Sequence, residues 1–248
     1  MTKGRIRVGI GGWTYPPWRE TFYPDGLPQR QELDYASRQF GAIEINATFY
    51  GRQSPQSWEN WAKAVPDGFE FAIKGSRYCV TRPKLADAGE GITTYFAQGM
   101  AALREKLGPV LWMLAARRKF DREDIAAFLK LLPLELGGIP LRHVIEPRHE
   151  SFRDEAFFAL CRDNDVAIVF GDDDEFPCID ADTASFAYAR LQRMREKVLT
   201  GYDDDALDAF ATRARRWQKD GRDSYLFMIN GAKLRAPAAA LALQERLG

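Results

Sequence analysis

Charged side chains stand in this chain at the points where short apolar stretches end. Glu44, Lys74 and Glu146 lie at or next to the last residues of three such stretches. A carboxylate held near cations stays ionised and suits a general base, whereas a lysine suits an electrophile or a general acid. We therefore predict Glu44, Lys74 and Glu146 as candidate catalytic residues.

Arginine, aromatic and amide side chains follow the same stretches and predict a ligand site. Arg148 and Arg190 suit a phosphate or carboxylate, because the planar guanidinium group gives two parallel hydrogen bonds. The predicted ligand-binding residues are Trp13, Tyr15, Asn46, Tyr50, Arg148, His149, Asp172, Arg190 and Asn230. Together with the catalytic candidates they predict a site for a small anionic or phosphorylated molecule, and they leave open whether that molecule is bound or turned over.

The elements that must position these residues alternate between strand and helix. Strands are predicted at 5–10, 42–46, 69–74, 110–114, 143–146, 166–170, 186–191 and 225–229. Helices are predicted at 29–40, from 54 onward, and at 93–107, 121–132, 154–164, 206–217 and 237–247, with no helical period over 171–185. Eight such units favour an α/β fold, a closed (β/α)₈ TIM-type barrel that is irregular because no helix separates strands six and seven. An open doubly wound sheet is the alternative, but no Gly-x-Gly-x-x-Gly follows a strand.

A parallel barrel gathers the carboxyl ends of its strands at one mouth, where ligand sites form. Because side chains alternate along a strand, Glu44 shares a face with Asn46, Glu146 with Arg148, and Arg190 with Gln192. These groups could instead form a self-neutralising network in which Glu44 pairs with Lys74 and Glu146 with Arg190. We favour the ligand site, because barrel mouths usually hold one.

Basic residues recur in the loops that follow the predicted strands. They are Arg77, Arg82 and Lys84; Arg117, Arg118 and Lys119; Arg193, Arg195 and Lys197; and Lys233 and Arg235. An acidic run at 172–175 interrupts this basic face. These loops support an alternative function, in which a non-catalytic protein binds nucleic acid or a protein partner.

Composition limits the other function classes. The chain has 248 residues, with 35 Lys and Arg against 35 Asp and Glu, which argues against a dedicated nucleic-acid or membrane-surface protein. It reads as one domain over 1–248, because neither a repeat nor a linker-like segment interrupts it. The three scattered cysteines and the polar start predict a cytoplasmic protein, and no apolar run approaches the roughly 20 residues of a membrane span.

Neither a cofactor nor a metal is predicted. No phosphate-binding Gly-x-x-x-x-Gly-Lys-Ser/Thr motif occurs, and the chain has only two histidines, His143 and His149. A multi-zinc site would need more imidazole or thiolate groups. One hard ion held by Glu146, His149 and Asp172 is the weakest alternative.

The residues at the strand ends resemble those of a known family. The shared motifs are 11–15 (GGWTY), 22–24 (FYP), 44–50 (EINATFY), Lys74, 107–109 (LGP), Glu146-x-Arg148-His149, 187–191 (AYARL) and 236–237 (AP). On these motifs the chain resembles the YecE-like proteins, domain-of-unknown-function family 72 (DUF72), over nearly its whole length. The resemblance implies a TIM-type barrel and a single domain, and it implies no particular reaction, because the family's biochemical role is not established.

The chain departs from that family pattern at the predicted mouth. The fourth strand ends in Met113-Leu114-Ala115-Ala116 where the family usually has Gln-Leu-Pro-Pro, and Gln192 replaces a common histidine. Pro147 stands where the family usually has phenylalanine, and Ile229-Asn230-Gly231 where it has Asn-Asn-Asp. These changes imply a different ligand or a lost activity.

Overall fold

Nine strands of the computed structural model, which describes residues 3–248, form one parallel sheet. Their order is β8-β7-β4-β3-β2-β1-β11-β10-β9. The strands are β1 (Ile6–Gly11), β2 (Ala42–Ile45), β3 (Glu70–Lys74), β4 (Leu107–Met113), β7 (His143–Glu146), β8 (Ala167–Ile168), β9 (Phe170–Asp172), β10 (Phe186–Leu191) and β11 (Asp223–Met228). Each of the eight strands predicted from the sequence corresponds to a strand of this sheet, and the sixth corresponds to β8 and β9 together.

The two ends of this order belong to one segment of the chain. β8 pairs with β7 and β9 pairs with β10, while only Val169 separates β8 from β9. The Val169 amide donates to the Ile145 carbonyl at 2.9 Å, which continues the pairing with β7. The sheet is therefore a nearly closed barrel whose sixth strand is split, and the predicted TIM-type barrel is confirmed.

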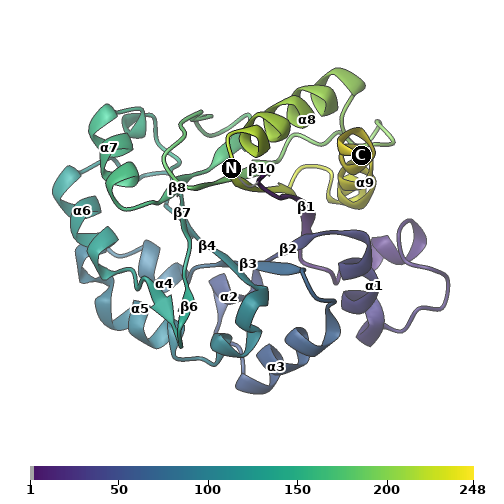
Figure 1. Ribbon diagram of the computed structural model, residues 1–248, viewed down its shortest axis with the longest axis horizontal. Coiled ribbons are helices and arrows are strands. Elements are labelled where there is room, and N and C mark those ends of the chain that lie inside the picture. The colour runs from purple at the N-terminus through teal and green to yellow at the C-terminus, as the bar shows by residue number, and fades with distance from the viewer. Residues whose placement is uncertain (1–2) are drawn as a thin grey trace.

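Helices surround the strands on the outside of the barrel (Figure 1). They are α1 (Glu32–Gln39), α3 (Pro55–Ala64), α5 (Gly89–Phe96), α6 (Arg122–Leu131), α7 (Glu155–Asp163), α8 (Asp204–Lys219) and α9 (Ala236–Leu247), with the single turns α2 (Ala47–Tyr50) and α4 (Arg77–Val80). Residues 173–185, between β9 and β10, contain neither helix nor strand. None of the helices within 3–248 combines the length and the apolar character needed to cross a bilayer.

Local sequence signals explain where several helices begin. The Ser54 hydroxyl accepts from the Ser57 amide at 3.1 Å, and Pro55 opens α3. One Asp121 oxygen accepts hydrogen bonds from the amides of Glu123 and Asp124 at the start of α6. Such caps satisfy amide groups that have no partner inside the helix.

The single helix expected at 93–107 is wrong. The α-helix α5 ends at Phe96, and a 3₁₀ segment covers Met100–Lys106. Gly99 lies between them with φ of 103°, a left-handed conformation that ends a helix and favours glycine. Gly108 and Pro109, which follow the predicted helix, already belong to β4.

The apolar core has two layers. The larger lies between the sheet and the helices. The smaller fills the barrel, with Ala42, Ala72, Leu111, Val144, Ala167, Val169, Phe186, Tyr188, Tyr225, Phe227 and Ile229. A side chain added at Gly9 of β1 would place its Cβ 1.9 Å from the Ala42 carbonyl oxygen, so glycine permits the close approach of β1 and β2. The barrel is thus packed through its middle, and polar groups are left to its two ends.

A buried ionic cluster occupies the end of the barrel where the strands begin. Glu70 pairs with both Arg7 and Arg142, and the Tyr225 hydroxyl donates to Glu70 Oε2 at 2.6 Å. Arg7 also contacts Asp223 at 3.3 Å. This cluster satisfies its own charges and closes the amino end of the barrel.

Candidate functional site

A second buried ionic cluster lies at the opposite end, where the strands finish. Arg190 of β10 donates through Nε to Glu44 Oε2 and through Nη2 to Glu44 Oε1, both at 3.2 Å. Its Nη1 donates to Glu146 Oε2 at 2.6 Å, and the Tyr188 hydroxyl donates to Glu44 Oε2 at 2.7 Å. Arg190 therefore links the carboxylates of β2 and β7 across the barrel, and all four side chains are buried.

Arg148 adds a second cation to this cluster. Its Nε and Nη2 donate to Glu146 Oε1 at 3.2 and 3.0 Å, and its guanidinium carbon lies 4.3 Å from the Phe176 ring centroid. Burial works against the ionised form of Glu146, but Arg190 and Arg148 outweigh it and hold the pKa of this carboxyl below its usual value. Glu146 is thus a stable carboxylate, already satisfied by two arginines.

Tyr188 acts as a hydrogen-bond donor in the cluster. Burial raises the pKa of its hydroxyl well above the usual value, and the Glu44 carboxylate raises it further. The hydroxyl therefore keeps its proton and supports Glu44. Tyr188 was not among the residues predicted from the sequence, although it shares the inward face of β10 with Arg190.

Lys74 at the end of β3 differs from its charged neighbours. Its side chain is buried, and its Nζ lies 4.4 Å from the Phe49 ring centroid. No carboxylate in the described part of the chain forms a salt bridge with it. Of the two pairings in the alternative network, that of Glu44 with Lys74 does not form, whereas that of Glu146 with Arg190 does. The pKa of Lys74 is lowered to about 8, mainly by burial. The cations Arg190 and Arg148 also lower it, while Glu44 and Glu146 raise it.

Lys74 lines a cavity of about 450 Å³ at this end of the barrel. The polar side chains around it come from four strand ends and include those of Asn46, Asn230 and Lys233. The aromatic side chains of Trp13 and Tyr50 complete its wall, and Tyr50 is largely exposed. Five of the predicted site residues, namely Trp13, Asn46, Tyr50, Lys74 and Asn230, are thus brought together.

Lys233 is a second cation without a carboxylate partner within residues 3–248. Its Nζ lies 4.7 Å from the Tyr15 ring centroid and 5.5 Å from that of Trp18. Burial lowers its pKa. From the sequence, Lys233 was predicted only as one of the basic loop residues. It follows β11 by a few residues and lies close to Asn230 in the chain, and this position could have predicted its place at the mouth.

Gln192, a position where the chain departs from the family pattern, contacts Asn230 at the same mouth. The Asn230 amide nitrogen donates to Gln192 Oε1 at 2.5 Å, and Asn230 adopts a left-handed φ of 58°. The buried Ile229 also lines the cavity. The wall beside β11 is therefore partly apolar.

Asp172 and His149 lie apart from this cavity. Asp172 is the last residue of β9, and its side chain lies on the outward face of that strand. There it pairs with Arg193 and accepts a hydrogen bond from the Tyr202 hydroxyl at 2.8 Å. The His149 ring accepts from the Ser151 amide at 3.1 Å through Nδ1 and thereby caps a 3₁₀ turn (Glu150–Phe152). From Lys3 onward, no three His, Cys, Asp or Glu residues are grouped so that they could hold a metal ion.

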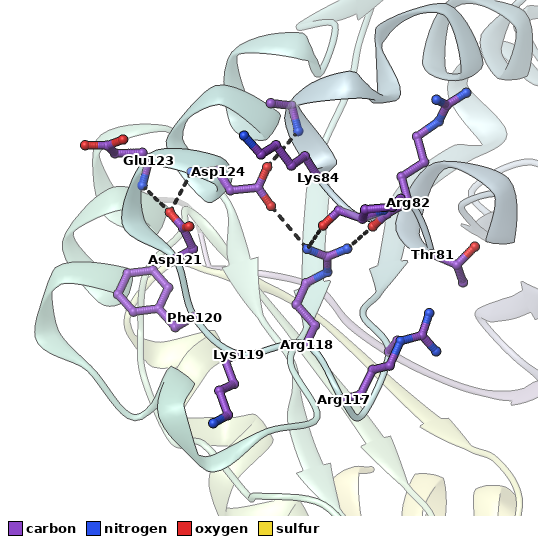
Figure 2. A pocket seen from close by; sticks show the side chains of 13 residues that line it. Thr81, Arg82, Lys84, Arg117, Arg118, Lys119, Phe120, Asp121, Glu123 and Asp124 are labelled. Atoms are coloured by element: carbon purple, nitrogen blue, oxygen red, sulfur yellow. Dashed lines mark hydrogen bonds and ion pairs between the residues drawn. The ribbon is translucent and has the colours of Figure 1, made fainter.

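A larger cavity of about 810 Å³ lies among the loops after β3 and β4 (Figure 2). Arg118 donates to Asp124 Oδ2 at 3.1 Å and to the carbonyl oxygens of Arg82 and Pro83. Figure 2 shows Arg117 and Lys119 extending away from that network. Acidic groups line this cavity as well as basic ones, so its charge is mixed.

Comparisons with known proteins agree with this architecture. The UPF0759 protein YunF of Bacillus subtilis (strain 168) is 24% identical over 158 residues, which cover 62% of this chain and 54% of that protein. The matched stretch thus spans about half the length of that relative.

Solved structures extend the likeness to the whole barrel. A DUF72 family protein from Thermotoga maritima MSB8 superposes with a TM-score of 0.76 at 20% identity, covering 97% of each chain. A fusion protein of a xylose isomerase-like TIM barrel with a 4-hydroxyphenylpyruvate dioxygenase matches all of this chain over 44% of its own, with a TM-score of 0.54 at 17% identity. At these identities the likeness concerns the fold.

The model of the family described as "Protein of unknown function DUF72" matches residues 7–248. The motifs at the strand ends had implied this family, and the match covers all of the barrel strands except Ile6, the first residue of β1. The chain therefore belongs to the DUF72 family of TIM-barrel proteins.

Proposed function

We propose that the 450 Å³ cavity at the carboxyl end of the barrel binds a small anionic molecule, a carboxylate or a phosphorylated compound. The observation that carries this proposal is that Lys74 and Lys233 both line the cavity without a carboxylate partner among the described residues. Cations of this kind attract an anion strongly, because burial limits screening by water.

The charged side chains that line the cavity, among the described residues, are the two cations Lys74 and Lys233, and the neighbouring buried cluster balances its own charges. Glu44 and Glu146 balance Arg190 and Arg148, with which they form the buried cluster. Lys74 and Lys233 remain unbalanced. We had expected Arg148 and Arg190 to hold the anion, but Arg190 directs donors from all three guanidinium nitrogens to the two glutamates. We therefore assign the anion to the lysines and the balance of charge to the arginines.

Asn46, Asn230, Trp13 and Tyr50 supply the other contacts in this proposal. The amide groups can donate hydrogen bonds to the anion, and the rings can cover its apolar part. A few polar groups in a mostly apolar wall are the usual arrangement of a small-molecule site.

A thermal-denaturation experiment tests the proposal. Inorganic phosphate and pyruvate should each raise the melting temperature of the wild-type protein, because a molecule that binds only the native state stabilises it; a concentration of about 100 times Kd gives about 2.7 kcal/mol. The rise should be lost in Lys233→Ala and in Lys74→Met. Lys63→Ala changes an exposed lysine of α3 and is the matched control.

Equal stabilisation of the wild-type protein, the control and both cavity variants would show that the anion binds elsewhere. Isothermal titration calorimetry with the same two anions then gives the affinity of each variant directly.

A second candidate function rests on the larger cavity. Lys84, Arg117 and Lys119 line it, and none of them forms a salt bridge with a carboxylate of residues 3–248. Such cations suit the phosphates of a nucleic acid. Binding of a single-stranded oligonucleotide at two salt concentrations tests this alternative, which requires affinity that falls steeply with salt and is weakened in Arg117→Ala.

The cysteines support a cytoplasmic location as part of the proposal. Cys79, Cys161 and Cys178 are free thiols, and the first two are buried. Unpaired thiols suit a reducing compartment.

A further inference from the structure

We propose that Lys74 forms a transient imine with its ligand, so that the anionic molecule in this cavity is an aldehyde or a ketone. This inference rests on the proposed anion site in the same cavity and goes beyond binding: it assigns to Lys74 the role of a nucleophile.

The position of Lys74 suits covalent chemistry. Its side chain is only 6% exposed, yet it lines the cavity that would hold the ligand. No hydrogen bond engages its Nζ within residues 3–248, and the ammonium rests against the face of Phe49. Once the proton leaves, the lone pair on nitrogen is therefore free to attack a carbon in the cavity.

Lys106 shows what a structural lysine looks like in the same protein. Its Nζ donates to the carbonyl oxygens of Ala62 and Val65 at 2.8 and 2.7 Å, and it approaches Asp67 at 3.8 Å. All of these contacts hold the amino group of Lys106 in place. Lys74 has none of them, although it is as deeply buried.

Burial is the main cause that favours the neutral amine of Lys74, and two nearby cations add to it. Arg190 of β10 and Arg148, which follows β7, lower the pKa of Lys74. Glu44 on β2 and Glu146 on β7 raise it, but both are bound to those arginines. Lys233, across the cavity, is a further cation. A lysine beside other cations in a poorly hydrated pocket is the recognised arrangement of an amine nucleophile.

The protonation state follows from this environment. With a pKa of about 8, Lys74 is neutral in about a tenth of the molecules at pH 7, against fewer than about one in a thousand for an ordinary lysine. The nucleophilic form is thus present at neutral pH without a separate base.

The chemical step is balanced without any further reactant. The ammonium first releases a proton. The neutral amine then attacks the carbonyl carbon, a C–N bond forms, and the carbonyl electron pair moves to oxygen, which takes up a proton from the nitrogen. The carbinolamine hydroxyl takes up the proton that the ammonium released and leaves as water while the nitrogen lone pair forms the C=N bond. Ammonium and carbonyl thus become iminium and water, and hydrolysis reverses the step.

A pair of aldehyde probes tests the inference and keeps it separate from anion binding. The protein is treated with limiting pyridoxal 5′-phosphate or with pyridoxal, which lacks the phosphate, then reduced with borohydride, and the modified lysines are identified by peptide mass mapping. We expect Lys74 to be modified at least tenfold faster than Lys63 and Lys106. The rate should rise with pH and reach half its maximum near pH 8.

Lys74→Arg keeps a positive charge but cannot form the imine, so its cavity should remain unmodified. The thermal shift caused by inorganic phosphate shows whether this variant is folded and still binds an anion. Lys74→Met, with its melting curve, provides a second variant if the larger arginine disturbs the site.

The outcomes separate the two proposals. Modification of Lys74 by both aldehydes at equal rates supports the imine and contradicts the anion site. A phosphate-induced thermal shift without modification of Lys74 supports the anion site and overturns the imine. Modification of Lys233 in preference to Lys74 also overturns it.

Discussion

Residue chemistry at the two ends of the barrel is similar, yet the two clusters differ in one respect. Glu70 at the amino end is satisfied by Arg7, Arg142 and Tyr225. The cluster around Arg190 at the carboxyl end is satisfied in the same way, but it stands beside a lysine with no carboxylate partner in the described chain and beside a cavity. A buried ionic network alone is typical of a structural role. The amine of Lys74, which has no carboxylate partner among the described residues, is what indicates a functional site.

Removal of Arg190 should be strongly destabilising. Arg190→Met leaves Glu44 and Glu146 in a buried position with one shared cation fewer, and breaking such a network costs about 3–5 kcal/mol of the free energy of unfolding. Urea denaturation measures this loss. Arg195→Met is the matched control, because Arg195 pairs with Asp203 where both side chains are more than half exposed, and it should cost about 1 kcal/mol or less.

The same variant should change the titration of Lys74. Arg190 lowers the pKa of Lys74, and the glutamates that it releases raise it. The pH at which aldehyde labelling reaches half its maximum should therefore move upward in Arg190→Met. An unchanged midpoint would mean that the cation does not control the amine.

Individual elements were predictable to different degrees. The strands were found because each is a short apolar stretch, and their ends carry the side chains that meet at the mouth. The helix expected at 93–107 failed because Gly99 breaks it, and a periodicity of apolar residues does not reveal a left-handed φ. The register of β9 is a similar case: Asp172 faces outward because Gly171, and not Asp172, lies opposite Arg190.

His143 in β7 should make the protein less stable in mild acid. Burial lowers its pKa from the ordinary 6.5 to about 4, while its ring accepts from Trp112 at 3.2 Å and contacts the Pro133 carbonyl at 2.7 Å. Between these two pH values the unfolded chain binds more protons than the folded one. Stability is therefore full above about pH 6.5 and falls as the pH drops towards 4.

Urea denaturation at pH 7 and pH 4.5 measures that loss in the wild-type protein and in His143→Gln. The variant should lose less stability over this interval, because the two proteins share every other titrating group. The same loss in both would exclude His143 as the cause.

The close approach of β1 and β2 gives a prediction at the level of strands. Gly9→Ala would force a Cβ to within 1.9 Å of the Ala42 carbonyl oxygen, so the strands must separate, at a cost of about 1–3 kcal/mol or more. Gly171→Ala is the control, because nothing lies within 4 Å of its added Cβ. Thermal denaturation should separate the two variants clearly; equal melting temperatures would contradict the packing described for β1.

The whole molecule was more predictable than its site. Alternation of strands and helices and the motifs at the strand ends were enough for the barrel and the family. They could not show which charges neutralise one another, because pairing depends on side-chain reach across the barrel. Glu44 lies beside Lys74 in the order of strands, yet it binds Arg190 from β10.

The packed barrel interior and the ionic cluster around Glu70 determine how a ligand can enter and leave the cavity. A molecule in the cavity finds no exit beneath it, because Tyr188, Phe227 and their neighbours fill the centre. A ligand must therefore bind and leave through the same open side of the cavity, so a second molecule binds only after the first has dissociated. The rate at which one bound molecule leaves would then limit how soon the next can bind.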